Sequence, residues 1–395
     1  MREGEAVSSP SPPEQAPLAR LRSLDGLRGA AAVIVLVHHT LLTIPVLAGA
    51  YYASGPDRAS RPLAWAATYT PLHFVWAGSE AVDLFFLLSG VVLTLPALGR
   101  APRWWASYYP RRLIRLYVPT IAAVAFGYLL VVMVPRANLA GLGAWLEDRP
   151  KQITGLGALK DLTLVDGVSY VTSTLWSLQW EVQFSLLLPV FVLIGLALRR
   201  FVVLEVALLG VAMLLGGIAN DGRLLFLPIF AVGVAMAIDF DRLRALAARI
   251  DSHRFSRYIW VGITAAAVML FTAYWPLQAF GDSRRIYAIT RVMIVAGAAA
   301  FIFLAVFAGP LRRILENRVF QWLGMLSFSL YLVHEPIVIA TGILAGPHLR
   351  WVAMVVGPLT AFATAMAFQR LIERPGHRWA RSIGNATSAC LRSRT

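Results

Sequence analysis

The sequence predicts an all-helical polytopic integral membrane protein with about ten transmembrane helices. Of its 395 residues, 58% are hydrophobic and only 14% are charged, whereas a soluble domain has nearer a quarter of its residues charged. The apolar residues gather in runs of about 20, the length that a helix needs to cross a bilayer. A formal net charge of +15 would suggest nucleic acid as the partner of a soluble protein. Here the charge lies in loops between apolar runs, so we expect no nucleic-acid partner and a multi-pass position in the cytoplasmic membrane.

The predicted spans follow one another along most of the chain. They cover residues 28–48, 74–98, 112–134, 175–198, 201–219, 223–239, 257–276, 287–309, 321–345 and 351–372. Residues 1–23 are rich in Pro, Ser and Glu and predict a disordered cytoplasmic tail. Residues 24–376 are predicted to form one transmembrane domain, and the polar residues 377–395 a second cytoplasmic tail. We expect no cleaved signal peptide, because the first apolar run starts late and carries charged residues.

The distribution of basic residues predicts that both termini are cytoplasmic. An even number of spans puts the termini on one side, and 25 of the 36 basic residues then fall in the tails and loops of that side. Basic residues favour the cytoplasmic face. The longest loop on the opposite side covers 135–174. A plain solvated loop is the simpler prediction for it, and a lid or an acceptor-binding element is the alternative.

The first span carries the most informative residues. It opens on the run Leu24-Asp-Gly-Leu-Arg-Gly29, and two adjacent histidines follow its apolar part. Arg28 and His39 are eleven residues apart, so a helix places both on one face with about 16 Å between them along the axis. His38 falls roughly 80° from that face. Because ionisable residues inside a span are costly, Arg28 and His39 are predicted to be functional. The alternative is an anchoring arginine and packed polar histidines.

Three further spans carry ionisable residues at a depth similar to that of His39. They are Asp83, Glu181 and the pair His334 and Glu335. Charged groups at such depth do not face lipid cheaply, so we expect all of them to share one partly hydrated cavity. The alternative for each residue is a structural hydrogen bond between helices.

Three arginines at the start of the third span predict an anion site at the cytoplasmic edge. Arg111, Arg112 and Arg115 contain i,i+3 and i,i+4 pairs, which lie on one face of a helix. The planar fork of the guanidinium suits phosphate oxygens. Contact of the same side chains with anionic lipid headgroups is the alternative.

Together these groups favour acyl transfer to a hydroxyl. A neutral histidine is a suitable general base for an alcohol, a nearby carboxylate can fix its tautomer, and a basic cluster suits the phosphates of an acyl-CoA. The sequence has no GxSxG, HExxH or P-loop pattern, and its one cysteine, Cys390, lies in a polar tail. We therefore expect no metal site and no thiol nucleophile. The alternative is a transporter or flippase for an anionic lipid or metabolite; a non-enzymatic scaffold would leave the buried charges unexplained.

Six sequence blocks, in order, resemble the membrane-bound acyltransferase 3 family of acyl-CoA-dependent O-acyltransferases. Members of that family modify sugars, polysaccharides, glycolipids and some antibiotics, and the similarity runs from about residue 22 to 376. The blocks are Leu24–Gly29 with the Arg28–His39 spacing, Gly78–Gly90, Arg112-x-x-Arg115, Trp176–Phe184, Ser329–Pro336 and Ile372–Pro375. Each block alone is a weak signal, but six in this order in a chain of ten spans are specific.

The resemblance implies roles by position. His39 would be the catalytic base, and Arg28 would orient the site or contact the donor. Asp83 and Glu181 would support the site. The basic cluster, through Arg112 and Arg115, would bind acyl-CoA, and we expect acetyl-CoA as the donor co-substrate.

The acceptor is expected to be a hydroxyl of a sugar, a glycolipid, a cell-surface glycan or a secondary metabolite. His334, Glu335 and Trp176 are the residues that we expect to contact it. Some members of the family carry an appended esterase-like domain. We expect this chain to complete its reaction with the membrane domain.

Three positions depart from the family pattern. His38 duplicates the histidine, although only His39 keeps the spacing from Arg28. Ala81 stands where a glycine is common, and Ser185 where a tyrosine is common. The serine is expected to alter the cavity, and the alanine to have a mild effect.

Overall fold

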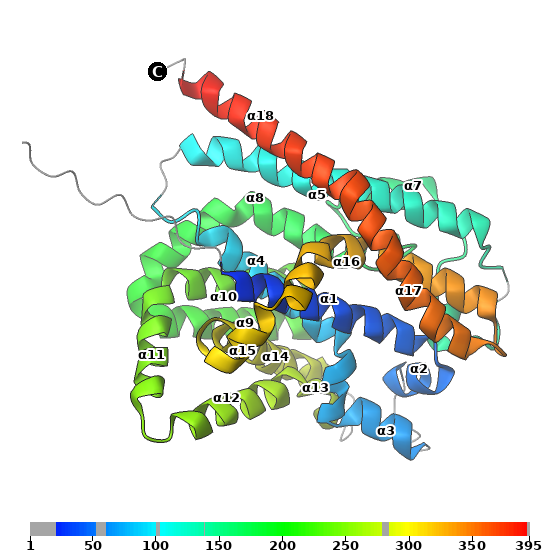
Figure 1. Ribbon diagram of the computed structural model, residues 1–395, viewed down its shortest axis with the longest axis horizontal. Coiled ribbons are helices and arrows are strands. Elements are labelled where there is room, and N and C mark those ends of the chain that lie inside the picture. The colour runs from blue at the N-terminus through cyan, green and yellow to red at the C-terminus, as the bar shows by residue number, and fades with distance from the viewer. Residues whose placement is uncertain (1–20, 53–60, 100–102, 138, 279–283, 393–395) are drawn as a thin grey trace, which may run out of the picture.

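The computed structural model describes residues 21–52, 61–99, 103–137, 139–278 and 284–392, which form helices and connecting turns with no strand among them (Figure 1). Each of the ten segments predicted as a span contains a helix. These helices are α1 (Arg22–Leu42), α4 (Gly78–Thr94), α5 (Arg103–Met133), α8 (Leu175–Leu198), α9 (Val202–Ala219), α10 (Gly222–Ile238), α12 (Ser256–Phe271), α14 (Arg284–Phe307), α16 (Arg318–Ala345) and α17 (Arg350–Phe368).

Shorter helices connect the long ones. They are α2 (Pro45–Tyr52), α3 (Pro62–Tyr69), a 3₁₀ helix (Pro71–Trp76), α6 (Ala144–Glu147), α7 (Gly155–Thr163), a 3₁₀ turn (Arg199–Phe201), α11 (Phe240–Ser252), α13 (Tyr274–Gln278), α15 (Gly309–Leu315), a π-helical turn (Gln369–Glu373) and α18 (Arg374–Arg392). Two of them, α6 and α7, lie in the long loop 135–174, so this loop is partly helical.

Six helical stretches of the described chain are long and apolar enough to cross a membrane. The number is seven if α10 and α11, which are bent by 70°, count as one span. The chain is therefore an all-helical multi-pass membrane protein, as predicted. The count falls below the predicted ten because α8 and α9 run on as one stretch of 45 residues. In addition, α4 and α12 have 17 and 16 residues, short of the roughly 20 that a full span needs.

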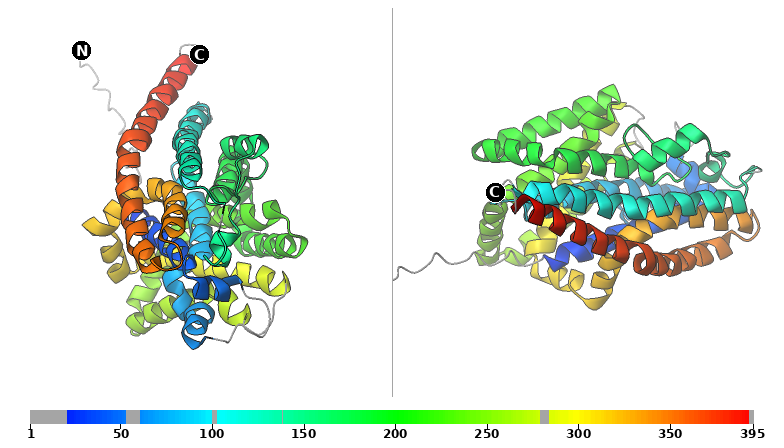
Figure 2. Two further views of the ribbon diagram at one scale, coloured as in Figure 1. Left: turned by 90° about the vertical axis from the view of Figure 1, so that its right-hand side faces the viewer. Right: turned by 90° about the horizontal axis from the view of Figure 1, so that it is seen from above.

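Helix α1 lies at the centre of the bundle, packed against α16 and α4 (Figures 1 and 2). Glycines allow α1 and α16 to approach closely. A Cβ on Gly29 would lie 2.5 Å from the backbone nitrogen of Gly324, and a Cβ on Gly324 would lie 2.3 Å from the carbonyl oxygen of Asp25. Only glycine tolerates such approaches. His39 and His334 lie ten residues beyond Gly29 and Gly324, respectively. Because α1 and α16 run parallel, the close approach at the glycines also brings the two histidines together.

The two ends of the chain differ from the prediction in different ways. The predicted tail 1–23 lies outside the described residues up to position 20, and α1 begins at Arg22, so its last two residues are helical. The predicted C-terminal tail is helical up to Arg392 and lies alongside α5 (Figure 1). Pro375 follows directly on the π-helical turn Gln369–Glu373, and such a local change of hydrogen-bond pattern accommodates a proline within a continuous helix.

Candidate active site

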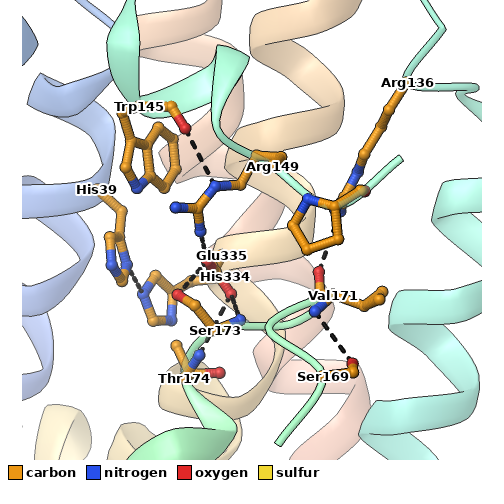
Figure 3. A network of polar contacts seen from close by, with 11 residues as sticks. His39, Arg136, Trp145, Arg149, Ser169, Val171, Ser173, Thr174, His334 and Glu335 are labelled. Carbon is orange, nitrogen blue, oxygen red and sulfur yellow. Dashed lines mark hydrogen bonds and ion pairs between the residues drawn. The ribbon is translucent and has the colours of Figure 1, made fainter. Parts of the chain in front are cut away.

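Two histidines from different helices contact each other at the centre of the site. Nδ1 of His39, in the last turn of α1, lies 2.8 Å from Nε2 of His334 in α16 (Figure 3). The two rings stack with their centroids 5.0 Å apart. On its other side His39 stacks on Trp145, at 5.4 Å and an interplanar angle of 14°. His39 is thus held between two rings.

The hydrogen-bond partners assign the tautomers of the two histidines. Nδ1 of His334 lies 2.9 Å from the carbonyl oxygen of Leu330, and a carbonyl oxygen only accepts, so His334 carries a proton on Nδ1. A neutral His334 then presents the lone pair of Nε2, and Nδ1 of His39 donates to it. This leaves Nε2 of a neutral His39 unprotonated, which is the state a general base needs.

Behind the histidine pair, Glu335 is the centre of a buried polar network (Figure 3). Its side chain is 0% exposed. It accepts hydrogen bonds from the backbone N–H of Ser173 (2.6 Å) and Thr174 (3.3 Å) and from the Ser173 hydroxyl. Arg149, whose side chain is 9% exposed, completes the network as an ion pair at 3.3 Å. A buried carboxylate needs such partners, and here they hold the turn of α16 that carries His334.

The long loop 135–174 forms part of this site. Its residues Trp145 and Arg149 contact His39 and Glu335, and Nε of Arg149 also donates to the Trp145 carbonyl at 3.0 Å. Arg136 ties the loop together by donating to the carbonyl oxygens of Pro150 (3.1 Å) and Val171 (3.2 Å) (Figure 3). The prediction of a plain solvated loop is wrong, because its arginines and tryptophan satisfy buried partners of the bundle.

A cavity of about 830 Å³ lies at the end of the bundle where α1 begins and α17 ends. We call it the arginine cavity, because seven arginines and two carboxylates line it. These residues are Arg28, Arg112, Arg115, Arg370, Arg374, Arg378 and Arg381 with Glu181 and Glu373. Its positive charge suits an anionic ligand.

The predicted arginine cluster divides between two environments. Arg112 lines the cavity, forms an ion pair with Glu181, and donates from Nε to the Ser185 hydroxyl at 3.0 Å. Arg115 also lines the cavity. Arg111 does not, because it donates instead to Oδ1 of Asn385 on α18 at 2.7 Å. A shared face for all three arginines is therefore wrong, because α18 occupies the side of α5 on which Arg111 lies.

The arginine cavity ends close to the histidine pair. Its lining on α16 runs from Gly324 to Tyr331, and His334 follows one turn later, about 4.5 Å further along the axis. The ring of Tyr331 lies 6.0 Å from that of His334, centroid to centroid, and its hydroxyl lies 2.7 Å from the hydroxyl of Ser177. Tyr331 thus stands between the cavity and the histidines.

A profile of the acyltransferase 3 domain, described as an acyltransferase domain, matches residues 21–370. This range holds both histidines of the pair and most of the cavity lining. The chain belongs to the acyltransferase 3 family. Membership of this family implies an acyl donor. It also agrees with the resemblance that the sequence blocks indicate.

One curated relative in this family is a protein of Bacillus subtilis (strain 168) named "Putative peptidoglycan O-acetyltransferase YrhL". The two chains are 24% identical over 303 residues. The alignment covers 68% of this chain and 46% of the relative, so the chain spans about half the length of that protein. No solved structure matches the chain significantly.

Asp83 and Trp176 lie away from the histidine pair of this acyltransferase. Asp83 forms an ion pair with Arg291 on α14, and both side chains are buried. Trp176 packs against Phe86 and Phe226, with ring centroids 6.0 and 5.1 Å away. The single shared cavity that we predicted is wrong. The ionisable residues form three groups instead, because each carboxylate has its own arginine.

Sequence reasoning missed the second layer of the site. Trp145, Arg149 and Ser173 lie in a loop without periodicity, and no sequence signal marks them. The cavity arginines after residue 369 carried a usable signal, since Arg370, Arg374, Arg378 and Arg381 recur at intervals of three and four, which is one face of a helix. No group of three or more His, Cys, Asp or Glu in the described part of the chain is placed to hold a metal ion.

The sequence block that starts at Gly78 packs closely against His38 and so helps to fix the position of the histidines. A Cβ on Gly78 would lie 2.4 Å from Cγ of His38, whose Nδ1 donates to the Trp76 carbonyl at 2.9 Å. We expect Gly78→Val to displace His38 and the adjacent His39 and to lower the rate of acyl transfer by about 10- to 100-fold, since a shift of about 1 Å can have that effect. Steady-state kinetics of the purified variant measures it.

Gly262→Val in α12 is the matched control, because a Cβ there meets no atom within 4 Å. Both variants place a β-branched residue in a helix, so only the contact with His38 distinguishes them. A folded Gly78→Val protein with the rate of Gly262→Val would contradict the steric argument.

Proposed function

We propose that this protein transfers an acyl group, acetyl first of all, from acyl-CoA to a hydroxyl of a glycan or related acceptor. The observation that carries the proposal is the hydrogen bond between His39 and His334, one helical turn beyond the end of the arginine cavity. It leaves Nε2 of His39 free to take a proton. An arginine-lined cavity beside a free base supports a donor with phosphates and a reactive acyl group.

The donor would occupy the arginine cavity. Its phosphates would contact the guanidiniums of the cavity, and its pantetheine arm with the acyl thioester would follow α16 towards Tyr331. With the termini on the cytoplasmic side, as the distribution of basic residues favours, this cavity opens to the cytoplasm, where the donor is made. Glu181 holds the guanidinium of Arg112 at the wall, so its fork is oriented before the donor arrives.

The transfer step needs one base and no further reactant. Nε2 of His39 takes the proton of the acceptor hydroxyl as the oxygen forms a bond to the thioester carbonyl carbon. The carbon–sulfur bond then breaks, and the proton passes from His39 to the leaving thiolate, giving the ester and free thiol. Nδ1 of His39 keeps its hydrogen bond to His334 throughout, so His334 stabilises the imidazolium that forms.

The family and the relative support a glycan as the acceptor. The Bacillus protein is named for peptidoglycan, and a cell-surface glycan is our first candidate for this chain. The protein would then act in the cytoplasmic membrane. Glu335 and Arg149 are positioning residues, because they hold the turn of α16 that carries His334.

Arg112→Lys tests the donor site. We expect it to raise the dissociation constant for acetyl-CoA about tenfold, because a lysine lacks the planar fork that suits phosphate and cannot contact Glu181 and Ser185 at the same time. Isothermal titration of the purified protein in detergent measures it. Arg111→Lys is the matched control, because Arg111 does not line the cavity, and it should bind as the wild type does. Failure of the well-folded wild type to bind any acyl-CoA would contradict the proposed function and favour an anion transporter.

A further inference from the structure

A second cavity, of about 320 Å³, lies between the end of α2, the start of α4, α13 and α14. Its lining is unlike that of the arginine cavity, because five of its eleven residues are aromatic and one is an arginine. The aromatic residues are Tyr51, Tyr52, Tyr274, Trp275 and Tyr287. The donor site proposed above uses none of them, so a ligand bound in this cavity would be separate from the donor.

Two buried side chains in this cavity have polar atoms that nothing in the described chain satisfies. Glu80 is 2% exposed; its Oε1 accepts from Nε1 of Trp275 at 2.8 Å, while its Oε2 has no hydrogen-bond partner. Arg291 is 7% exposed; it pairs with Asp83 and donates to the Tyr287 hydroxyl at 2.8 Å, while its Nε has no partner. Buried polar atoms are rarely left in this state. Both residues line the cavity, so one unpaired acceptor and one unpaired donor lie in its wall.

The aromatic rings are fixed in place by their neighbours. Tyr51 and Trp275 lie 4.7 Å apart, centroid to centroid, and His73 stacks on Trp275 at 4.2 Å and 28°. Rigid rings beside a few polar atoms are typical of small-molecule sites. A ring that has apolar C–H faces and hydroxyls at its edge would match this lining.

The histidine pair stands between the two cavities. On the side of the second cavity, the ring of Tyr51 lies 5.1 Å from that of His38, which lies 5.3 Å from that of His39. On the side of the arginine cavity, Tyr331 lies 6.0 Å from His334. A hydroxyl would have to pass both Tyr51 and His38 to reach the base from the second cavity, while a thioester that passed Tyr331 would approach from the side of His334.

The two cavities also differ in charge. Seven arginines line the first, whereas the lining of the second carries Glu80 and the single cation Arg291, which pairs with Asp83 outside the lining. The second group is formally negative by one charge, which disfavours an anionic ligand and leaves neutral molecules free to bind. Charge would therefore direct the anionic donor to the arginine cavity and a neutral acceptor to the second cavity.

We propose that the second cavity is the acceptor subsite, that it binds a neutral, hydroxyl-rich saccharide ring, and that donor and acceptor reach His39 from opposite sides. This inference rests on the proposed acyltransferase function. Glu80 accepts a hydrogen bond from a hydroxyl or amide of the acceptor, Trp275 holds that carboxylate in place through Nε1, and the exposed ring of Tyr52 supplies a face for the saccharide ring.

The test measures acetyl transfer from acetyl-CoA to two tetrasaccharides, neutral tetra-N-acetylchitotetraose and anionic tetragalacturonate, by the full-length protein in detergent. We expect transfer to the neutral saccharide, with its KM raised about tenfold or more in Glu80→Gln and in Trp275→Leu and the KM for acetyl-CoA unchanged. The matched controls are Glu205→Gln, a buried carboxylate that lines neither cavity, and Trp351→Leu, an exposed tryptophan. Thermal unfolding shows which variants are folded.

The outcomes separate this inference from the function on which it rests. A wild type that binds no acetyl-CoA counts against the function itself. A wild type that transfers acetyl groups with the same saccharide KM in both folded variants, or that prefers tetragalacturonate, overturns the acceptor subsite alone. If acetyl-CoA binds without transfer, quenching of tryptophan fluorescence by the neutral saccharide decides: no saturable quenching overturns the subsite, and quenching lost in Trp275→Leu supports it.

Discussion

Replacing His39 with alanine is expected to lower the turnover number by about 10²- to 10⁴-fold, the usual contribution of a positioned general base. The physical reason is the tautomer that the structure assigns: Nδ1 of His39 donates to His334, which leaves Nε2 as the free base. Donor binding should be unchanged, because His39 does not line the arginine cavity. Parallel measurement of acetyl transfer and of acetyl-CoA affinity checks both statements.

His348→Ala is the control for this variant, since His348 is exposed in the turn before α17 and should retain full activity. His39→Ala also removes the ring between Trp145 and His334, so its thermal unfolding must be compared with that of the wild type. Near-normal turnover by a folded His39→Ala protein would refute the assignment of the base. Loss of acetyl-CoA binding together with turnover would instead place His39 in the donor site.

Replacing Glu335 with alanine should have the largest effect on stability, a loss of about 3–5 kcal/mol. The substitution leaves the buried guanidinium of Arg149 without its partner and three donors on Ser173 and Thr174 without their acceptor. Arg149 remains charged and cannot reach water easily. Thermal or denaturant unfolding in a fixed detergent, followed by circular dichroism, measures the change.

The control for Glu335 is an exposed ion pair of the same type. Asp241 and Arg244 on α11 lie 3.1 Å apart, with side chains 92% and 61% exposed, and Asp241→Ala should have no measurable effect on unfolding. A double variant in which Arg149 is also replaced by methionine should recover part of the loss, because the unpaired charge is then gone. Equal stability of wild type and Glu335→Ala would show that the network does not hold the site.

Polar contacts join sequence blocks that lie far apart in the chain. Ser177 of the fourth span meets Tyr331 of the ninth, with 2.7 Å between their hydroxyl oxygens. The hydroxyl of Ser329 donates to Glu373 at 2.5 Å, which joins the last two blocks. Three of the six blocks are thus joined by polar contacts, and residues of all three line the arginine cavity.

The prediction of one shared cavity is wrong because it used only the depth of each residue in the membrane. Position along a helix sets how deep a residue lies, but the rotation of the helix and its neighbours set what the residue meets. Sequence position predicts similar depths for Asp83, Glu181 and His39, yet Asp83 faces Arg291 and Glu181 faces Arg112. Burying a carboxylate beside its own guanidinium is cheaper than gathering several carboxylates in one space.

The sequence by itself determined the helices, the residue types of the site and the family. Apolar runs must form helices in a membrane because the backbone has no other hydrogen-bond partner there, and the Arg28–His39 spacing follows from helical geometry. Only the tertiary structure decided that Trp145 and Arg149 belong to the site, which nitrogen of His39 is free, and that a second cavity lies beyond His38. These depend on contacts between residues hundreds of positions apart, which packing selects and local sequence does not encode.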